Sequence, residues 1–198
     1  MSNTPMIDAA GICRRAKEMK TPLIVIDGLC GSGKTTLANE LSALLQAPVI
    51  HMDDFFLPFA LRTTQRLSQP GGNVDYERFE EEVLSRIGCD AAFTYGKFDC
   101  SEGTLTPAEC PAAGLRIVEG TYSMHPRFMS VWQERGALTV FASVPREEQL
   151  RRLALRNPRL LERFRTEWIP MENRYFSVFG VEEKAMVKWT SFMDIGQK

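Results

Sequence analysis

Residues 28–35 read Gly-Leu-Cys-Gly-Ser-Gly-Lys-Thr and fit the spacing G-x-x-x-x-G-K-[ST], which is typical of a loop that cradles phosphate. Glycines let the backbone curl until successive N–H groups point inward at one anion. Lys34 can then reach the β- and γ-phosphates of a nucleotide, and the Thr35 hydroxyl can bind Mg²⁺. The spacing predicts these nucleotide-binding residues: Gly28, Cys30, Gly31, Ser32, Gly33, Lys34, Thr35 and Thr36.

The segments on both sides of this loop are the ones that phosphate binding requires. Residues 23–26 form a short apolar run that predicts a buried strand, and residues 36–45 carry apolar side chains at helical spacing. A helix that begins at the loop adds the positive end of its dipole to the phosphate site. The alternative, an accidental glycine turn, would need neither flank.

Acidic residues follow two other predicted strands. Asp53 and Asp54 come after the strand at 49–52, and Glu119 comes after the strand at 115–118. The carboxyl ends of parallel strands meet at one edge of a sheet, so these side chains are expected beside the loop. We expect Asp53 to accept the proton of a substrate hydroxyl and Glu119 to help Thr35 hold Mg²⁺. The alternatives are a helix cap or turn for the aspartates and a strand-end ion pair for Glu119.

Arginines are concentrated near the C-terminal part of the chain. Arg152 and Arg156 are one helical turn apart, and such a pair can grip ATP phosphates when a lid closes. A solvated face with local pairs to glutamates is the alternative for any single arginine. The arginines in this stretch are Arg151, Arg152, Arg156, Arg159, Arg163 and Arg165.

The remaining pattern alternates strands with helices and predicts an α/β fold with a largely parallel sheet. Thr4 and Pro5 are expected to cap a helix over 6–19, and Asp75 is expected to cap another over 76–87. Residues 57–74 read as a loop because they contain Pro58, Pro70 and two glycines. The other predicted elements are short strands at 93–95 and 104–106, a strand at 138–141, helices at 146–156 and 160–179 with a kink or restart at 168–170, and a last strand at 185–190.

Composition excludes several classes of protein. A chain of 198 residues with 44% apolar and 25% charged residues predicts one globular domain over 1–198, with an N-terminal helix in 1–20 and lid and C-terminal helices in 151–179. A net charge of −1 and the lack of a long apolar run argue against nucleic-acid and membrane partners. Five cysteines without a C-x-x-C spacing predict reduced thiols in a cytoplasmic protein.

From about Pro22 to Phe179 the chain resembles the uridine kinase and nucleoside kinase group of P-loop kinases. The segment H-M-D-D-F-F-L-P at 51–58 resembles the D-S-F-Y segment of uridine kinases and, more closely, the D-D-F-F segment of nicotinamide riboside kinases. Further matching segments are N-V-D-Y at 73–76, I-V-E-G at 117–120 and the start of the lid at 152–157. The whole pattern, including W-I-P-M-E-x-x-Y-F at 168–176, looks most like bacterial proteins of the uridine kinase-like type.

This resemblance implies a P-loop NTPase fold, a three-layer α/β/α sandwich with a mostly parallel five-stranded sheet and a helical lid. It implies that Asp53 is the base and that Asp75 binds sugar hydroxyls. Phe55 belongs to the D-D-F-F segment, and Tyr95 lies in a loose match to the Y-D-F segment that helps to hold the pyrimidine in uridine kinases; both are therefore expected at the substrate.

The favoured interpretation is an ATP- and Mg²⁺-dependent kinase that phosphorylates an alcohol of a small molecule, with a nucleoside as the first choice. Another alcohol, such as a vitamin riboside, a pantothenate-like compound or a sugar, is an alternative acceptor. A nucleotide-binding switch protein is an alternative from another class, although N-K-x-D and L-S-G-G-Q segments are absent from the sequence. Whether the protein forms a homodimer is left open.

Overall fold

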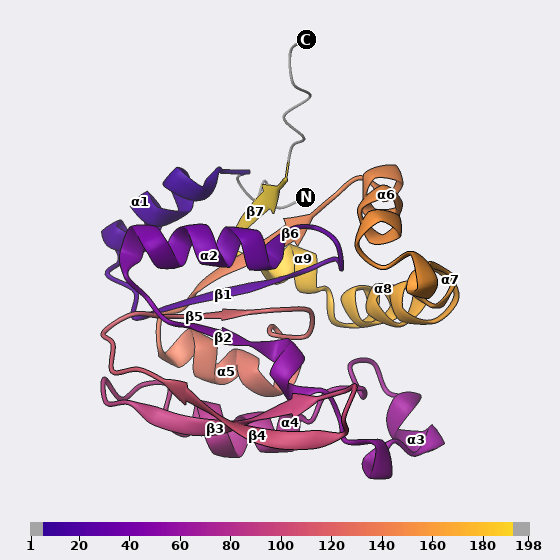
Figure 1. Ribbon diagram of the computed structural model, residues 1–198. Helices are drawn as coiled ribbons and strands as arrows, with labels where there is room; N and C mark the ends of the chain where they lie inside the picture. The colour runs from indigo at the N-terminus through magenta and orange to yellow at the C-terminus, as the bar shows by residue number, and fades with distance from the viewer. Residues whose placement is uncertain (1–5, 192–198) are drawn as a thin grey trace.

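Five parallel strands form the central sheet, in the order β2-β5-β1-β6-β7. The computed structural model describes residues 6–191. The carboxyl ends of β1, β2 and β5 point to the side where α6, α7 and α8 lie (Figure 1). The parallel α/β sheet predicted from the sequence is confirmed. Its strands are β1 (Leu23–Gly28), β2 (Val49–His51), β5 (Arg116–Glu119), β6 (Leu138–Ser143) and β7 (Val187–Thr190).

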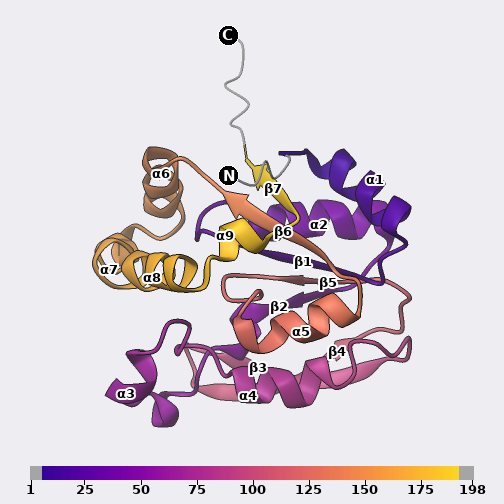
Figure 2. The ribbon, with the colours of Figure 1, turned by 180° about the vertical axis from the view of Figure 1, so that it is seen from behind.

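Helices cover both faces of this sheet. On one face α1 (Ala9–Met19) and α2 (Lys34–Leu45) pack against β1, β5 and β6, through an apolar cluster that includes Ile24 and Val140. On the other face lie α5 (Pro126–Glu134) and α8 (Ile169–Phe179), as the view from behind also shows (Figure 2). Every residue of β1 is buried, because a central parallel strand has helices on both sides. The result is a three-layer α/β/α arrangement.

The first helix begins at Ala9 rather than at Met6. Asp8 sets this start, because its Oδ1 accepts the N–H of Gly11 at 2.8 Å. Met6 instead forms a parallel bridge with Lys188 beside β7. The predicted cap at Thr4 and Pro5 lies outside the described residues.

The predicted loop at 57–74 contains a 3₁₀ turn over Phe59–Leu61 and a short helix, α3 (Thr64–Leu67). The predicted helix at 76–87 is divided. Asp75 caps α4 (Tyr76–Phe79) as expected, and its Oδ1 accepts the N–H of Arg78 at 3.1 Å. The chain then continues in a wider, π-helical turn over Glu80–Leu84.

A separate antiparallel hairpin, β3 (Phe93–Asp99) with β4 (Thr104–Cys110), replaces the two short strands expected at 93–95 and 104–106. The prediction was too short because most of β4 is exposed and lacks an apolar pattern. The side chains of Arg78 and Glu82 hold the hairpin at Gly96, whose N–H donates to Glu82 Oε2 at 2.7 Å and whose carbonyl accepts from Arg78.

The C-terminal helices restart where the sequence predicts. Between α6 (Arg146–Arg156) and α8 the chain makes short helical turns, namely Pro158–Leu160, α7 (Leu161–Arg163) and Phe164–Trp168. Pro170 lies in the first turn of α8, where its missing N–H costs nothing. Gly180, at a φ of 57°, ends α8 before α9 (Val181–Lys184). Within residues 6–191, none of the helices has both the length and the apolar character needed to cross a bilayer.

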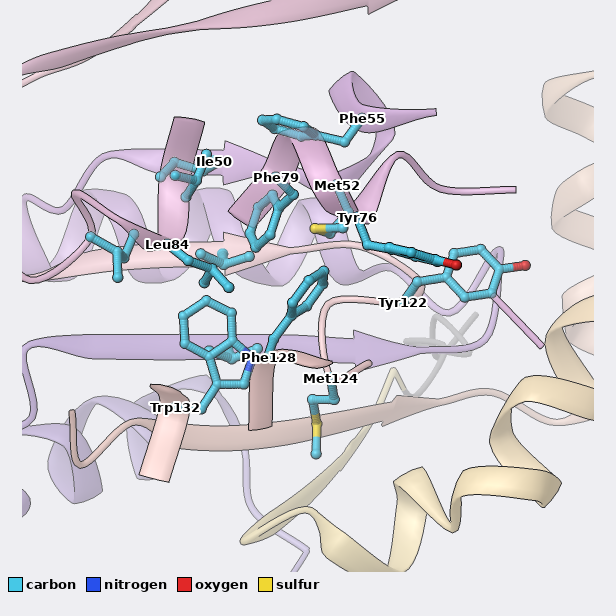
Figure 3. Packing of buried hydrophobic residues seen from close by; sticks show 14 of the residues in the cluster. Ile50, Met52, Phe55, Tyr76, Phe79, Leu84, Tyr122, Met124, Phe128 and Trp132 are labelled. Carbon is cyan, nitrogen blue, oxygen red and sulfur yellow. The ribbon is translucent and has the colours of Figure 1, made fainter. Parts of the chain in front are cut away.

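Aromatic side chains fill the core between the sheet, α4 and α5 (Figure 3). Phe79 lies at the centre of this group and is fully buried. Its ring centroid is 4.9 Å from that of Phe55 and 4.8 Å from that of Phe128, with Trp132 at 6.3 Å. Phe79 therefore connects the segment after β2 to α4 and α5.

We predict that Phe79→Ala lowers the free energy of unfolding by about 3–5 kcal/mol, because it leaves a cavity among rings that cannot collapse to fill it. Urea denaturation followed by circular dichroism measures the change. Phe59→Ala is the matched control, since Phe59 is 54% exposed. Equal losses from the two variants would contradict the central role of Phe79.

Candidate functional site

The phosphate-type loop joins the end of β1 to the start of α2, as predicted. Two of its glycines are required by geometry. Gly28 has a φ of 142°, and a Cβ there would lie 2.0 Å from the carbonyl oxygen of Ala142 on β6. Gly33 caps α2 with a φ of 93°, a conformation that other residues adopt only under strain.

The backbone N–H groups of the loop fall into two sets, of which the first is held by the protein. The acceptors are Asp27 Oδ1 for Gly28 at 2.7 Å, the Ala142 carbonyl for Leu29 at 3.1 Å, Glu172 Oε2 for Cys30 at 3.0 Å and the Leu29 carbonyl for Ser32 at 3.1 Å.

The second set has no protein acceptor within the part of the chain from residue 6 to residue 191. It comprises the N–H groups of Gly31, Gly33, Lys34, Thr35 and Thr36. They surround the N-terminus of α2, where the helix dipole favours an anion. The loop therefore presents a group of unused donors in the place where a phosphate would bind.

The Lys34 side chain is folded back onto this loop. Its Nζ donates to the carbonyl oxygens of Gly28 and Leu29, each at 2.9 Å. The side chain is largely buried, and its charge lowers the pKa of both Asp53 and Glu172. The cation therefore stands between the loop and two carboxylates from other elements.

Glu119 ends β5 and joins the loop helix to β2. Its Oε1 accepts from the Thr35 hydroxyl at 3.1 Å and lies 2.6 Å from His51 Nδ1. Its hydrogen bond raises the pKa of His51. Thr35 and Glu119, predicted together as a magnesium site, are thus in contact. Within residues 6–191 no cluster of three or more His, Cys, Asp or Glu side chains forms a metal site, so this pair would need phosphate oxygens and water as further ligands, which is how Mg²⁺ commonly binds.

The two adjacent aspartates point to different surroundings. Asp53 is exposed, in a short 3₁₀ turn over Met52–Phe55 that follows β2 directly. Protein closely surrounds the remaining sides of its carboxylate, and this desolvation raises the pKa of Asp53, with a further rise from Glu119. Lys34 and Arg156 act in the opposite direction. Asp53 is therefore a carboxylate that reaches solvent beside the phosphate loop.

Asp54 faces the hairpin instead. It is buried, accepts the Tyr95 hydroxyl at 3.1 Å and pairs with Lys97 Nζ at 3.3 Å. Its backbone carbonyl accepts from Arg78 at 2.8 Å. Asp54 thus attaches β3 to the segment that carries Asp53.

Phe55 and Tyr95, which we expected to contact substrate, lie in the core. Phe55 is fully buried and Tyr95 is 8% exposed. Their rings are stacked with centroids 5.4 Å apart. The two rings therefore pack together in the core behind Asp53, and their predicted contact with substrate stays a prediction.

Asp75 is also largely buried and is occupied by local interactions. Besides capping α4, its Oδ2 lies 3.5 Å from Arg78 Nε. Its backbone N–H donates to the Phe55 carbonyl at 2.8 Å, which places α4 beside the Asp53 segment. The predicted contact of Asp75 with sugar hydroxyls stays a prediction.

The two lid arginines differ. Arg152 is tied to Glu148 at 2.6 Å and to the loop carbonyls of Gly31 and Ser32 at 3.3 and 3.4 Å. It therefore packs on the outside of the phosphate loop. Arg156 is exposed, and its charge acts on Asp53. Arg152 would have to leave these partners to reach a bound phosphate, and the predicted phosphate contacts of both arginines stay predictions.

Two buried carboxylates at the loop were missed by the sequence interpretation. Asp27 is the penultimate residue of β1, and its side chain accepts from Gly28, Tyr122, Met124 and Tyr175. Glu172 on α8 accepts from Cys30. An ionisable residue inside an apolar strand run was the available signal for Asp27. Glu172 is the glutamate of the W-I-P-M-E segment at 168–172, but that resemblance assigned it no role.

Comparisons with known proteins agree with this fold and loop. The chain is 24% identical over 184 residues to a cytidylate kinase of Pyrobaculum arsenaticum, covering 87% of this chain and 86% of that one. It is 40% identical over 76 residues, 36% of each chain, to human nicotinamide riboside kinase 1. The structure of a possible uridine kinase from Bacillus stearothermophilus superimposes with a TM-score of 0.67 at 19% identity, over 91% of this chain and 96% of that one. No protein-family model matches the sequence.

The fold and the loop define a P-loop protein with a five-stranded parallel sheet. The chain is also similar to two small-molecule kinases, to one of them over most of its length and to the other over about a third of it.

His125, which begins α5, offers a test of the packing around the site. Its ring is stacked on that of Tyr76 at 5.1 Å, and burial lowers the pKa of His125 to about 4. The unfolded chain takes up this proton at higher pH than the folded one. Stability is therefore complete above about pH 6.5 and decreases as the pH falls toward 4, by an amount on the order of 3 kcal/mol.

We predict that His125→Asn, which keeps a capping side chain, loses this dependence. The difference in unfolding free energy between wild type and variant should shrink as the pH is lowered from about 7 to about 4.5. Urea denaturation at several pH values measures it. A constant difference would show that His125 is not held neutral.

Proposed function

We propose that the protein transfers the γ-phosphoryl group of ATP to a hydroxyl of a small molecule, with a nucleoside or a closely related riboside as the acceptor. The observation that carries this proposal is the exposed carboxylate of Asp53 beside Lys34 and the phosphate loop. A protein that only binds a nucleotide has no need of a base at that position. The names of the two similar proteins, a cytidylate kinase and a nicotinamide riboside kinase, support an acceptor of the nucleoside type.

In this proposal the backbone of the loop holds ATP, the phosphate donor. The unused N–H groups between Gly31 and Thr36 bind the phosphates, and Lys34 turns from the loop carbonyls toward the β- and γ-phosphate oxygens. Thr35 and Glu119 hold Mg²⁺, which neutralises phosphate charge when it is bound. Because the N–H groups of the loop are fixed before the nucleotide arrives, little reorganisation is needed during the reaction.

Asp53 has the role of general base. Its desolvated surroundings raise the pKa and make the carboxylate a better proton acceptor than a fully solvated aspartate. In its ionised form it accepts the acceptor's hydroxyl proton as the oxygen attacks the γ-phosphorus. The positive charge of Arg156 lowers the pKa of Asp53. The same charge stabilises the transferring phosphoryl group when the lid closes.

The acceptor's remaining contacts come from the segment around Asp53 and from the hairpin. Lys97 is the clearest candidate on β3, because its side chain is 55% exposed and its ammonium group lies at Asp54. Asp75 becomes accessible when its ion pair with Arg78 opens, so we assign it to the hydroxyls of a ribose that displaces Arg78.

We predict that Asp53→Asn lowers kcat by a factor of about 10²–10⁴, because the amide cannot accept the proton. ATP affinity stays the same or increases, since a negative charge near the phosphates has been removed. Initial rates and isothermal titration calorimetry measure the two quantities. Asp90→Asn, at an exposed position remote from the loop in sequence, is the control. Full activity of Asp53→Asn would show that another group is the base.

We predict that Lys34→Ala weakens ATP binding by at least about tenfold, since it removes the cation that faces the phosphates. Calorimetry with Mg-ATP measures the affinity. Lys17→Ala on α1 is the control, because that lysine is exposed on another helix. An unchanged affinity would contradict the use of this loop as the phosphate site.

The acceptor can be identified by ADP release from Mg-ATP in the presence of single compounds. Nucleosides and vitamin ribosides should stimulate release by the wild-type protein and not by Asp53→Asn. Stimulation only by sugars or pantothenate-like alcohols would replace the nucleoside assignment. ATP binding with no stimulation by any alcohol would favour a nucleotide-dependent switch protein.

A further inference from the structure

Glu172 is a buried acidic side chain that the proposed phosphoryl transfer does not use. It lies on α8, is 7% exposed and points at the phosphate loop rather than into solvent. Burial raises the pKa of its carboxyl group, and Asp27 raises it further, whereas Lys34 and the hydrogen bond from Cys30 lower it. Burying a carboxylate is unfavourable, so its place beside the loop needs a reason.

Glu172 contacts the residue that directly precedes the first unused N–H group of the loop. Its Oε2 accepts the N–H of Cys30 at 3.0 Å. The next residue, Gly31, is the first whose N–H has no protein acceptor in residues 6–191. Three residues after Glu172, Tyr175 donates to Asp27 Oδ2 at 2.7 Å. One face of α8 therefore fixes the loop at Asp27 and again at Cys30.

A second helix holds the same residue from the other side. Gln149 on α6 is 2% exposed, and its Nε2 donates to the Cys30 carbonyl at 2.9 Å. The N–H of Cys30 is thus bonded to α8 and its carbonyl to α6. Residues 157–168 join these two helices, and they fall within the stretch 151–179 that was predicted to hold the lid and the C-terminal helices.

We propose that Glu172 and Gln149 are positioning residues that clamp the backbone of Cys30 and so keep the following N–H groups aimed at the nucleotide phosphates. The clamp makes the phosphate loop sensitive to the arrangement of the two helices that carry the lid. This inference rests on the proposed nucleotide binding, but it does not depend on phosphoryl transfer or on the identity of the acceptor.

The hydrogen bond and the charge of Glu172 make opposite contributions to nucleotide binding. The hydrogen bond orders the loop, whereas the negative charge lies near the site of the anionic phosphates. Glu172→Gln keeps an oxygen that can accept from Cys30 and removes the charge. Glu172→Ala removes both. The two variants therefore separate the positioning role from electrostatics.

The experiment is calorimetric titration of the full chain with Mg-ATP in the absence of an acceptor, with thermal unfolding of each variant in parallel. Glu172→Ala should weaken ATP binding by about tenfold or more, and Glu172→Gln should restore wild-type affinity or exceed it. Gln149→Leu, which keeps the side-chain volume, should weaken binding in the same direction. Glu183→Ala, at an exposed position on α9, should bind like wild type.

Wild-type affinity of a folded Glu172→Ala would overturn the clamp. So would equally weak binding by Glu172→Gln and Glu172→Ala, because the carboxylate charge and not the hydrogen bond would then be required. If Glu172→Ala does not fold, Glu172→Gln and Gln149→Leu still decide the outcome. A wild-type protein that binds ATP but phosphorylates no alcohol would refute the proposed function and leave the clamp standing.

Discussion

The buried carboxylate of Asp27 is the constraint on which the site depends. It is fully buried and accepts four hydrogen bonds, from the N–H groups of Gly28, Tyr122 and Met124 and from the Tyr175 hydroxyl. An uncompensated carboxylate in this position would be strongly destabilising, and burial raises the pKa of Asp27. The donors come from three separate parts of the chain: the phosphate loop, the connection after β5, and α8. All three must be in place for the carboxylate to have its full set of hydrogen bonds. The geometry of the loop is therefore tied to the packing of the whole sheet edge and not to its glycines alone.

The connection after β5 links Asp27 to the part of the chain that lies next to the Asp53 segment. Tyr122 adopts a positive φ of 80°, which is costly for a residue with a bulky side chain and is maintained by its surroundings. Its N–H reaches Asp27, its ring packs against that of Tyr175 at 4.8 Å, and its Cδ1 lies 3.5 Å from where a Cβ on Gly71 would be. The Tyr122 side chain thus spans from the donor site to the segment that pairs with the chain after Asp53. Strain at one residue is balanced by contacts to three separate segments.

The sequence predicted what depends on local pattern. The strand, glycine loop and helix at 23–45 have recognisable spacing, and the carboxyl-end rule brought Asp53 and Glu119 to the loop. The resemblance selected Asp53 as the base, but the sequence assigned no role to its neighbour Asp54. The structure shows that Asp54 instead binds the hairpin, through Tyr95 and Lys97. Phe55 and Tyr95 were expected at the substrate because the resemblance rests on residue types. An aromatic ring can pack in a core as well as bind a substrate, and these two rings are stacked on each other. Glu172 follows the loop by more than a hundred residues, so its contact with the loop becomes visible only in the tertiary packing of α8.

The proposed ATP side of the site and the proposed side for the phosphate acceptor differ in how firmly the fold holds them. The donor side rests on backbone groups fixed by β1, β6 and α8, with acceptors for one set of N–H groups and a helix terminus behind the other. The acceptor side is a short 3₁₀ turn attached to a two-stranded hairpin through the side chains of Asp54, Arg78 and Glu82. Side chains that join a hairpin to the core can be exchanged without moving the strands of the main sheet. A fold arranged in this way can keep its phosphate donor while changing the alcohol it accepts, which is consistent with a strongly patterned phosphate loop beside an acceptor region that matches its relatives only in part.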